Sequence, residues 1–91
     1  DCACGTGQAT LGLAERYSRV LATDASAAQL AQAPAVANVE WRVAHAEDSG
    51  LPAASVDLVC VAQALHWLPY AAFYAEVDRV LRPGGVLAVV C

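Results

Sequence analysis

Two glycines and one aspartate are spaced so that this chain could bind a nucleotide-like cofactor. Gly5 and Gly7 lie in the opening segment Asp-Cys-Ala-Cys-Gly-Thr-Gly, directly before a pattern typical of a helix. Glycine lets the backbone approach a ligand closely, because it lacks a Cβ atom and can adopt positive φ angles. Asp24 follows after about 20 residues, at the end of an apolar run, where the acid of a βαβ unit binds a ribose. A Gly-x-Gly pair by itself is equally typical of a tight turn.

The elements that must position these residues alternate between helices and strands. Apolar residues recur at helical spacing over residues 8–17, and Ser26 is suited to cap a second helix that ends at Ala33, before a proline. Apolar or alternating runs predict strands over residues 20–23, 39–44 and 56–61, and a last strand from Val86. This order predicts an α/β fold with a Rossmann-like open, mainly parallel sheet and helices on both faces.

Residues 70–82 predict an amphipathic helix. Its apolar and charged residues occupy opposite faces, with Phe73, Val77, Val80 and Leu81 on one and Glu76, Asp78, Arg79 and Arg82 on the other. We expect a solvated charged face with weak pairing of Glu76 with Arg79 and of Asp78 with Arg82. The Arg-Pro-Gly-Gly segment at residues 82–85 is expected to end this helix. Trp41, in an alternating strand, is expected either to pack under a helix or to face an exposed margin.

Charge and hydropathy disfavour several classes of partner. The net charge of −4, with five basic residues, argues against a nucleic-acid-binding surface. No apolar run approaches the roughly 18 residues that span a bilayer, and no signal segment is evident at the N-terminus. We therefore expect a cytoplasmic protein with no nucleic-acid or membrane partner. The sequence does not indicate an oligomeric state.

The four cysteines show no Cys-x-x-Cys pair and no Cys/His cluster with metal-ligand spacing. We expect no metal site, and thiols that are buried or in loops without a functional role. Cys2 and Cys4 lie beside the glycine turn, where their thiols could be sensitive to oxidation.

Taken together, these segments resemble the class I S-adenosylmethionine-dependent methyltransferases, and within them the type 11 methyltransferase group. The resemblance covers essentially the whole chain, and its segments stand in the family's order: residues 1–7, Asp24, residues 46–48, residues 57–67 and residues 81–85. It implies that residues 1–91 form one partial S-adenosylmethionine-binding methyltransferase domain. As a fragment, this domain is expected to lack most of the first strand and the C-terminal strands.

The resemblance also assigns roles to individual residues. It implies cofactor contacts from Asp1, Gly5 and Gly7 at the methionine end, Asp24 at both ribose hydroxyls, Ala46 and Glu47 at the adenine, and Ala62 and Gln63 near the methionine portion. Asp48 could serve in place of Glu47. Two positions depart from the family pattern: Ala3 stands where the first glycine is usual, and His45 where many members carry an acid.

The reaction implied is methyl transfer from S-adenosylmethionine to a small-molecule acceptor by in-line displacement, which mainly requires alignment of donor and acceptor. If the acceptor must lose a proton, His66 is the candidate base, because it follows a strand end and an imidazole titrates near neutral pH. The alternative is that His66 and Trp67 form a packing corner. Two other functions stay open: a catalytically inactive methyltransferase-like binding or scaffold domain, and a nicotinamide-dependent Rossmann oxidoreductase.

Overall fold

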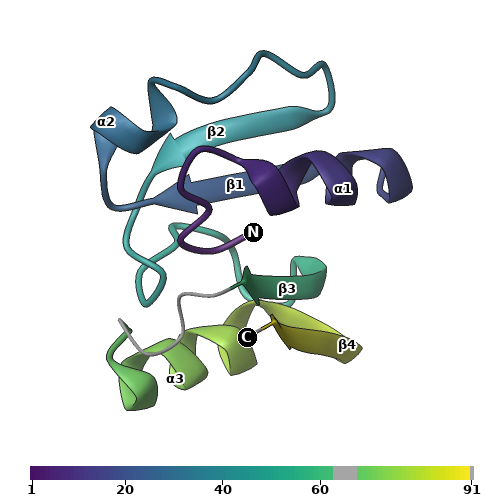
Figure 1. Cartoon of the computed structure of the whole chain (residues 1–91). Coiled ribbons are helices and arrows are strands. Elements are labelled where there is room, and N and C mark those ends of the chain that lie inside the picture. The colour runs from purple at the N-terminus through teal and green to yellow at the C-terminus, as the bar shows by residue number, and fades with distance from the viewer. Residues whose placement is uncertain (63–67, 91) are drawn as a thin grey trace.

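The helices and strands follow one another along the chain in the predicted order (Figure 1). The computed structural model of the chain describes residues 1–62 and 68–90. Its elements are α1 (Gln8–Arg16), β1 (Val20–Asp24), α2 (Ala27–Leu30), β2 (Val39–Val43), β3 (Val56–Ala62), α3 (Tyr70–Val80) and β4 (Leu81–Val90). The side chain of Ser26 accepts a hydrogen bond from the backbone N–H of Gln29, which confirms the predicted cap of α2.

Two parallel strand pairs form the sheet. β1 pairs with β2, with Asp24 opposite Val43, and β3 pairs with β4. Cys2 forms single parallel bridges to Thr23 of β1 and Val61 of β3, so that the N-terminal residues lie between the two pairs. The carboxyl ends of these strands therefore meet at one edge of the sheet, next to the glycine turn. The prediction of an open, mainly parallel sheet is confirmed.

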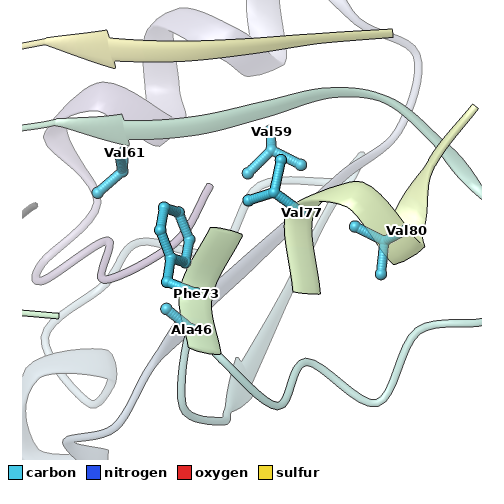
Figure 2. Close-up of a cluster of buried hydrophobic side chains, with 6 residues drawn as sticks. All are labelled: Ala46, Val59, Val61, Phe73, Val77 and Val80. Carbon is cyan, nitrogen blue, oxygen red and sulfur yellow. The ribbon is translucent and has the colours of Figure 1, made fainter. Parts of the chain in front are cut away.

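A cluster of buried hydrophobic side chains packs α3 against β3 (Figure 2). It contains Ala46, Val59, Val61, Phe73, Val77 and Val80. Phe73 and Val61 are fully buried, and the three residues from α3 recur at helical spacing on one face. The predicted apolar face of this helix is thus confirmed for Phe73, Val77 and Val80, while Leu81 lies beyond the helix and is only partly buried.

Two helices end earlier than the sequence predicts. α2 ends at Leu30 rather than Ala33, and α3 ends at Val80, because Leu81 is already extended with φ −70° and ψ 135°. The Arg-Pro-Gly-Gly segment therefore belongs to β4, which was expected to begin only at Val86. Within the described part of the chain, no helix is long and apolar enough to cross a membrane.

The start of β4 is irregular, and this irregularity explains why the sequence pattern missed it. Val56 of β3 lies opposite Leu81, but the next paired residue, Leu58, lies opposite Val86. The residues between Leu81 and Val86 form a bulge that contains Pro83, which has no N–H to contribute to the ladder. The continuous apolar run of β4, Val-Leu-Ala-Val-Val at residues 86–90, therefore begins only after the bulge.

A cavity of about 970 Å³ adjoins Asp1 between the two strand pairs. Its lining includes Val20 and Leu21 of β1, Leu58 and Val59 of β3, and Phe73 and Val77 of α3. Within the described residues, β1 and β3 are joined through the bridges of Cys2.

Candidate cofactor site

The opening segment turns through three left-handed residues before α1 begins. Ala3, Gly5 and Gly7 have φ angles of 51°, 60° and 97°. Gly7 donates its N–H to the carbonyl of Cys4 at 3.0 Å, and its own carbonyl accepts the first helical hydrogen bond, from Leu11. No side chain caps this helix end, so the first N–H groups of α1 are available to a ligand at the positive end of the helix dipole.

Asp24 connects this turn to the end of β1. One oxygen of its carboxylate accepts the N–H of Gly5 at 2.9 Å, and the other accepts the N–H of Ser26 at 2.8 Å. An ionised carboxylate has about four acceptor positions, so each oxygen retains the capacity for one more hydrogen bond. The residue is half-buried. Asp24 can therefore shape the turn and still accept the hydroxyl groups of a ligand.

Asp1 is held against α1 from the other side. The hydroxyl of Thr10 donates to the Asp1 carboxylate at 2.6 Å, and Thr10 itself is fully buried. The backbone nitrogen of Asp1 also donates to the carbonyl of Leu21 at 2.8 Å. The structure thus joins Asp1, Gly5 and Asp24 through short hydrogen bonds around the start of α1. The sequence did not single out Thr10, because a threonine within a helical pattern carries no signal for a contact nine residues away.

Ala3 occupies the left-handed region, which non-glycine residues rarely adopt. This conformation costs an alanine about 1 kcal/mol or more relative to the ordinary regions. The turn therefore keeps a glycine-like backbone at the position where the resembled family has glycine. The extra methyl group is accommodated at the cost of backbone strain rather than by a different turn.

The loop after β2 begins beside Asp24. The N–H of Ala44 donates to the Asp24 carbonyl at 3.0 Å, and a tight turn follows in which Asp48 donates its N–H to the carbonyl of His45. The side chain of Ala46 is buried in the core cluster with Phe73, so that residue can offer a ligand only its backbone. Glu47 is half-buried. Whether Ala46 and Glu47 contact adenine stays a prediction.

The far end of this loop is tied to α3 by Glu76. One carboxylate oxygen of Glu76 accepts both the N–H and the hydroxyl of Ser49, at 2.9 and 2.5 Å. Arg79 pairs with the same carboxylate at 2.7 Å, as predicted, but the Glu76 side chain is only 10% exposed. The hydrogen bond from Arg79, aided by those from Ser49, lowers the pKa of Glu76 from 4.5 to about 2. The expectation that Glu76 is a solvated surface charge is wrong.

Arg82 also has a different partner from the one expected. It contacts Asp57 at 3.0 Å rather than Asp78, because Arg82 lies in β4 beside the start of β3 and not on the helix. Both side chains are largely exposed, with 52% and 74% of their surfaces accessible. This pair lies at the amino end of β3, away from the glycine turn, and contributes little to stability.

The remaining predicted site residues begin with Ala62, the last residue of β3. The bridge from Cys2 to Val61 places Ala62 at the same sheet edge as the glycine turn. Gln63 and His66 lie outside the described residues, and their predicted roles stay predictions. Among residues 1–62 and 68–90, no three His, Cys, Asp or Glu side chains are grouped so that they could hold a metal ion.

The thiols beside the turn are poor nucleophiles. Burial raises the pKa of the Cys2 thiol. Burial, together with the nearby Asp24 carboxylate, raises the pKa of the Cys4 thiol from 9.0 to about 11. Both groups are therefore protonated at neutral pH, and the thiolate is the form that reacts with oxidants and alkylating agents.

Trp41 is a further residue of this site. It packs under the N-terminal end of α1, which agrees with one of the two expectations for this residue. It lies in β2, and its ring reaches the space beside Gly7. A Cβ atom on Gly7 would lie 2.5 Å from Cη2 of Trp41. The alternating strand pattern predicted the orientation of Trp41 only relative to the sheet. Its contact with a turn more than 30 residues earlier has no local signal.

Comparisons with known proteins agree with this arrangement. Residues 1–89 match the family described as the methyltransferase domain. Trans-aconitate 2-methyltransferase from Azoarcus sp. (strain BH72) is 43% identical over 93 residues, which cover 98% of this chain and 36% of that protein. The chain thus spans about a third of the length of this relative.

Solved structures show the same fold. A presumed type II methyltransferase from Anaeromyxobacter dehalogenans is 54% identical, with a TM-score of 0.93 over 98% of this chain and 38% of that one. An S-adenosylmethionine-dependent methyltransferase from Mesorhizobium loti is 30% identical, with a TM-score of 0.86 over 96% of this chain and 43% of that one. The Rossmann-like arrangement predicted from the sequence is confirmed by these neighbours.

Proposed function

Because the chain belongs to the methyltransferase domain family, we propose that it binds S-adenosylmethionine and transfers the methyl group to a small-molecule acceptor. Asp24 is the observation that carries this proposal. Its carboxylate holds Gly5 and Ser26 and retains acceptor capacity on both oxygens, at the edge where the strands end. Two vicinal hydroxyls of a ribose are a natural partner for such a carboxylate.

The backbone of the turn fits the other end of the cofactor. A Cβ atom on Gly5 would meet only the Gln29 side chain, at 3.9 Å, so the surface beside Gly5 is open to a ligand. We assign the methionine end of the cofactor to Asp1, Gly5, Gly7, Ala62 and Gln63. The positive end of α1 favours the carboxylate of that group.

The adenine is assigned to the loop after β2. Ala46 would contribute its backbone, since its side chain is buried, and Glu47 would contribute its half-exposed side chain. Ser49 and Glu76 hold the end of this loop against α3, so the loop is anchored near Asp24 at one end and on α3 at the other.

S-adenosylmethionine, when bound, supplies an electrophilic methyl group. The protein must then align the acceptor with that group and, for a hydroxyl or amine acceptor, remove a proton. His66 is the proposed base. His66→Ala separates this role from a packing role: a base predicts a loss of turnover whose size changes with pH, whereas normal turnover across pH would remove the proposal.

Transfer of labelled methyl groups tests the function directly. The complete polypeptide that carries these 91 residues is incubated with methyl-labelled S-adenosylmethionine and a panel of small acceptors. The panel should begin with trans-aconitate, because the Azoarcus relative is named for it. Label recovered in an acceptor supports the proposal. Selective binding of a reduced nicotinamide cofactor, with no binding of S-adenosylmethionine, would support an oxidoreductase instead.

The strained Ala3 favours one alternative, a domain that binds the cofactor without catalysing transfer. Strain in the turn does not prevent binding but can misplace the methyl group relative to an acceptor, and misplacement of about 1 Å has large effects on rate. This alternative predicts measurable binding with no transfer to any acceptor. Transfer that appears when Ala3→Gly is introduced would identify Ala3 as the cause.

A further inference from the structure

We propose that Trp41 is a positioning residue for the cofactor turn: its indole ring supports Gly7 and fixes where the N-terminus of α1 lies. The inference rests on the proposed function, because the position of α1 matters to the extent that its first N–H groups face a cofactor. Its basis is the contact between β2 and the turn.

The contact is specific to the far end of the indole ring. A Cβ atom on Gly7 would come within 2.5 Å of Cη2 and 2.9 Å of Cζ3 of Trp41. Real Cβ atoms essentially never approach other atoms this closely, and Gly7 is buried and already has a φ angle of 97°. The six-membered ring of Trp41 thus fills the space that a side chain at residue 7 would need, and any larger residue at position 7 must displace it.

Within the described part of the chain, the position of Trp41 leaves a buried hydrogen-bond donor without a partner, which costs stability. Its indole N–H is buried and has no hydrogen-bond partner among the described residues. A buried donor without a partner destabilises a fold, whereas phenylalanine would bury a ring there without that cost. The longer reach of the indole ring, which brings Cη2 to Gly7, is what tryptophan adds at this position.

The same strand also holds the other end of α1. The side-chain amide of Asn38, directly before β2, donates to the carbonyls of Ala14 and Tyr17, both at 2.8 Å. In the middle of β2, Trp41 pairs with the fully buried Ala22 of β1. β2 therefore fixes α1 at both ends, with Asn38 at the C-terminus and Trp41 at the N-terminal turn.

A double-mutant cycle tests the contact without any ligand. In the complete polypeptide, the free energy of unfolding is measured by denaturant titration for the wild type, Gly7→Ala, Trp41→Leu and the double variant. The strain of alanine at a φ angle of 97° is common to both backgrounds and cancels. If the ring causes the clash, Gly7→Ala lowers the free energy of unfolding by less in the Trp41→Leu background than in the wild type. If the effects of the two substitutions on the free energy of unfolding are additive, the ring does not contact residue 7 and the proposal is overturned.

Cofactor affinity then tests the positioning role. Trp41→Leu is expected to weaken S-adenosylmethionine binding about tenfold in calorimetry, and Trp41→Phe to recover part of that loss. Val80→Ala is the matched control, because it destabilises a buried position of α3 but leaves the turn intact. Trp41→Leu with unchanged affinity would reduce Trp41 to a packing residue and overturn the proposal. Absence of binding by the wild type, with coupling in the unfolding cycle, would contradict the proposed function instead of the contact.

Discussion

The Asp24 carboxylate accepts the N–H of Gly5 at 2.9 Å, so the end of β1 directly holds the glycine turn. Its second oxygen accepts the N–H of Ser26, which begins the approach to α2. The residue expected to bind the ribose therefore also shapes the backbone around it. This double role means that a change at Asp24 affects both the turn and the ligand.

Replacement of Ala3 by glycine is expected to stabilise the fold. The φ angle of 51° is strained for alanine and not for glycine, although glycine also gains entropy in the unfolded chain, so the net gain is expected to be about 0.5 kcal/mol. Denaturant unfolding measures it. Ala54 has the same φ angle of 51° and serves as a matched control away from the turn. Both glycine variants should gain stability, but only Ala3→Gly should change cofactor affinity; loss of stability in Ala3→Gly would contradict the left-handed conformation.

Glu76 is expected to make the fold sensitive to acid. Its folded-state pKa of about 2 lies below the ordinary 4.5, so its contribution to stability is present above pH 4.5 and is lost as the pH falls toward 2. Glu76→Gln should therefore lower the free energy of unfolding by about 2 kcal/mol at pH 7 and flatten its decline in that pH window.

Asp57→Asn provides the comparison for Glu76→Gln, because the pair of Asp57 with Arg82 is exposed and weak. It should leave the pH dependence nearly unchanged. Equal pH dependence in the wild type and Glu76→Gln, measured by thermal unfolding from pH 2 to 7, would show that the Ser49 and Arg79 contacts do not stabilise the ionised carboxylate.

Cys4 is expected to react slowly with alkylating agents. With a pKa of about 11, its thiolate fraction near pH 8 is on the order of a hundredfold lower than that of an ordinary cysteine. Iodoacetamide labelling with peptide mapping measures the rate, and the same peptide in the denatured chain gives the unperturbed reference. Rapid labelling of Cys4 in the folded protein would contradict the burial described here and revive the prediction of an oxidation-sensitive turn.

Local patterns in the sequence predicted most of the fold. The apolar runs located β1 and β3, the helical spacing of Phe73, Val77 and Val80 located the buried face of α3, and Ser26 marked the start of α2. The early end of α3 was missed, because the residues after it remain in an extended bulge that pairs with β3. Such pairing depends on residues distant in the sequence.

For the same reason, the sequence predicted only part of the candidate site. Gly5 and Asp24 belong to a spacing pattern, and the structure joins them by a hydrogen bond. The contacts of Trp41 with Gly7, and of Glu76 with Ser49, link segments that are 27 or more residues apart and have no pattern in common. They depend on how the elements pack, which the spacing of residues along the sequence does not reveal.

Calorimetric titration of S-adenosylmethionine into the complete polypeptide, for the wild type, Asp24→Ala and Asp57→Ala, tests the central claim most directly. The account predicts binding by the wild type and by Asp57→Ala, and at least about tenfold weaker binding by Asp24→Ala, because the variant loses the carboxylate proposed to accept both ribose hydroxyls. Circular dichroism confirms that all three are folded. Equal affinity of the three folded proteins, or no binding by the folded wild type, would contradict the assignment of the cofactor to this turn.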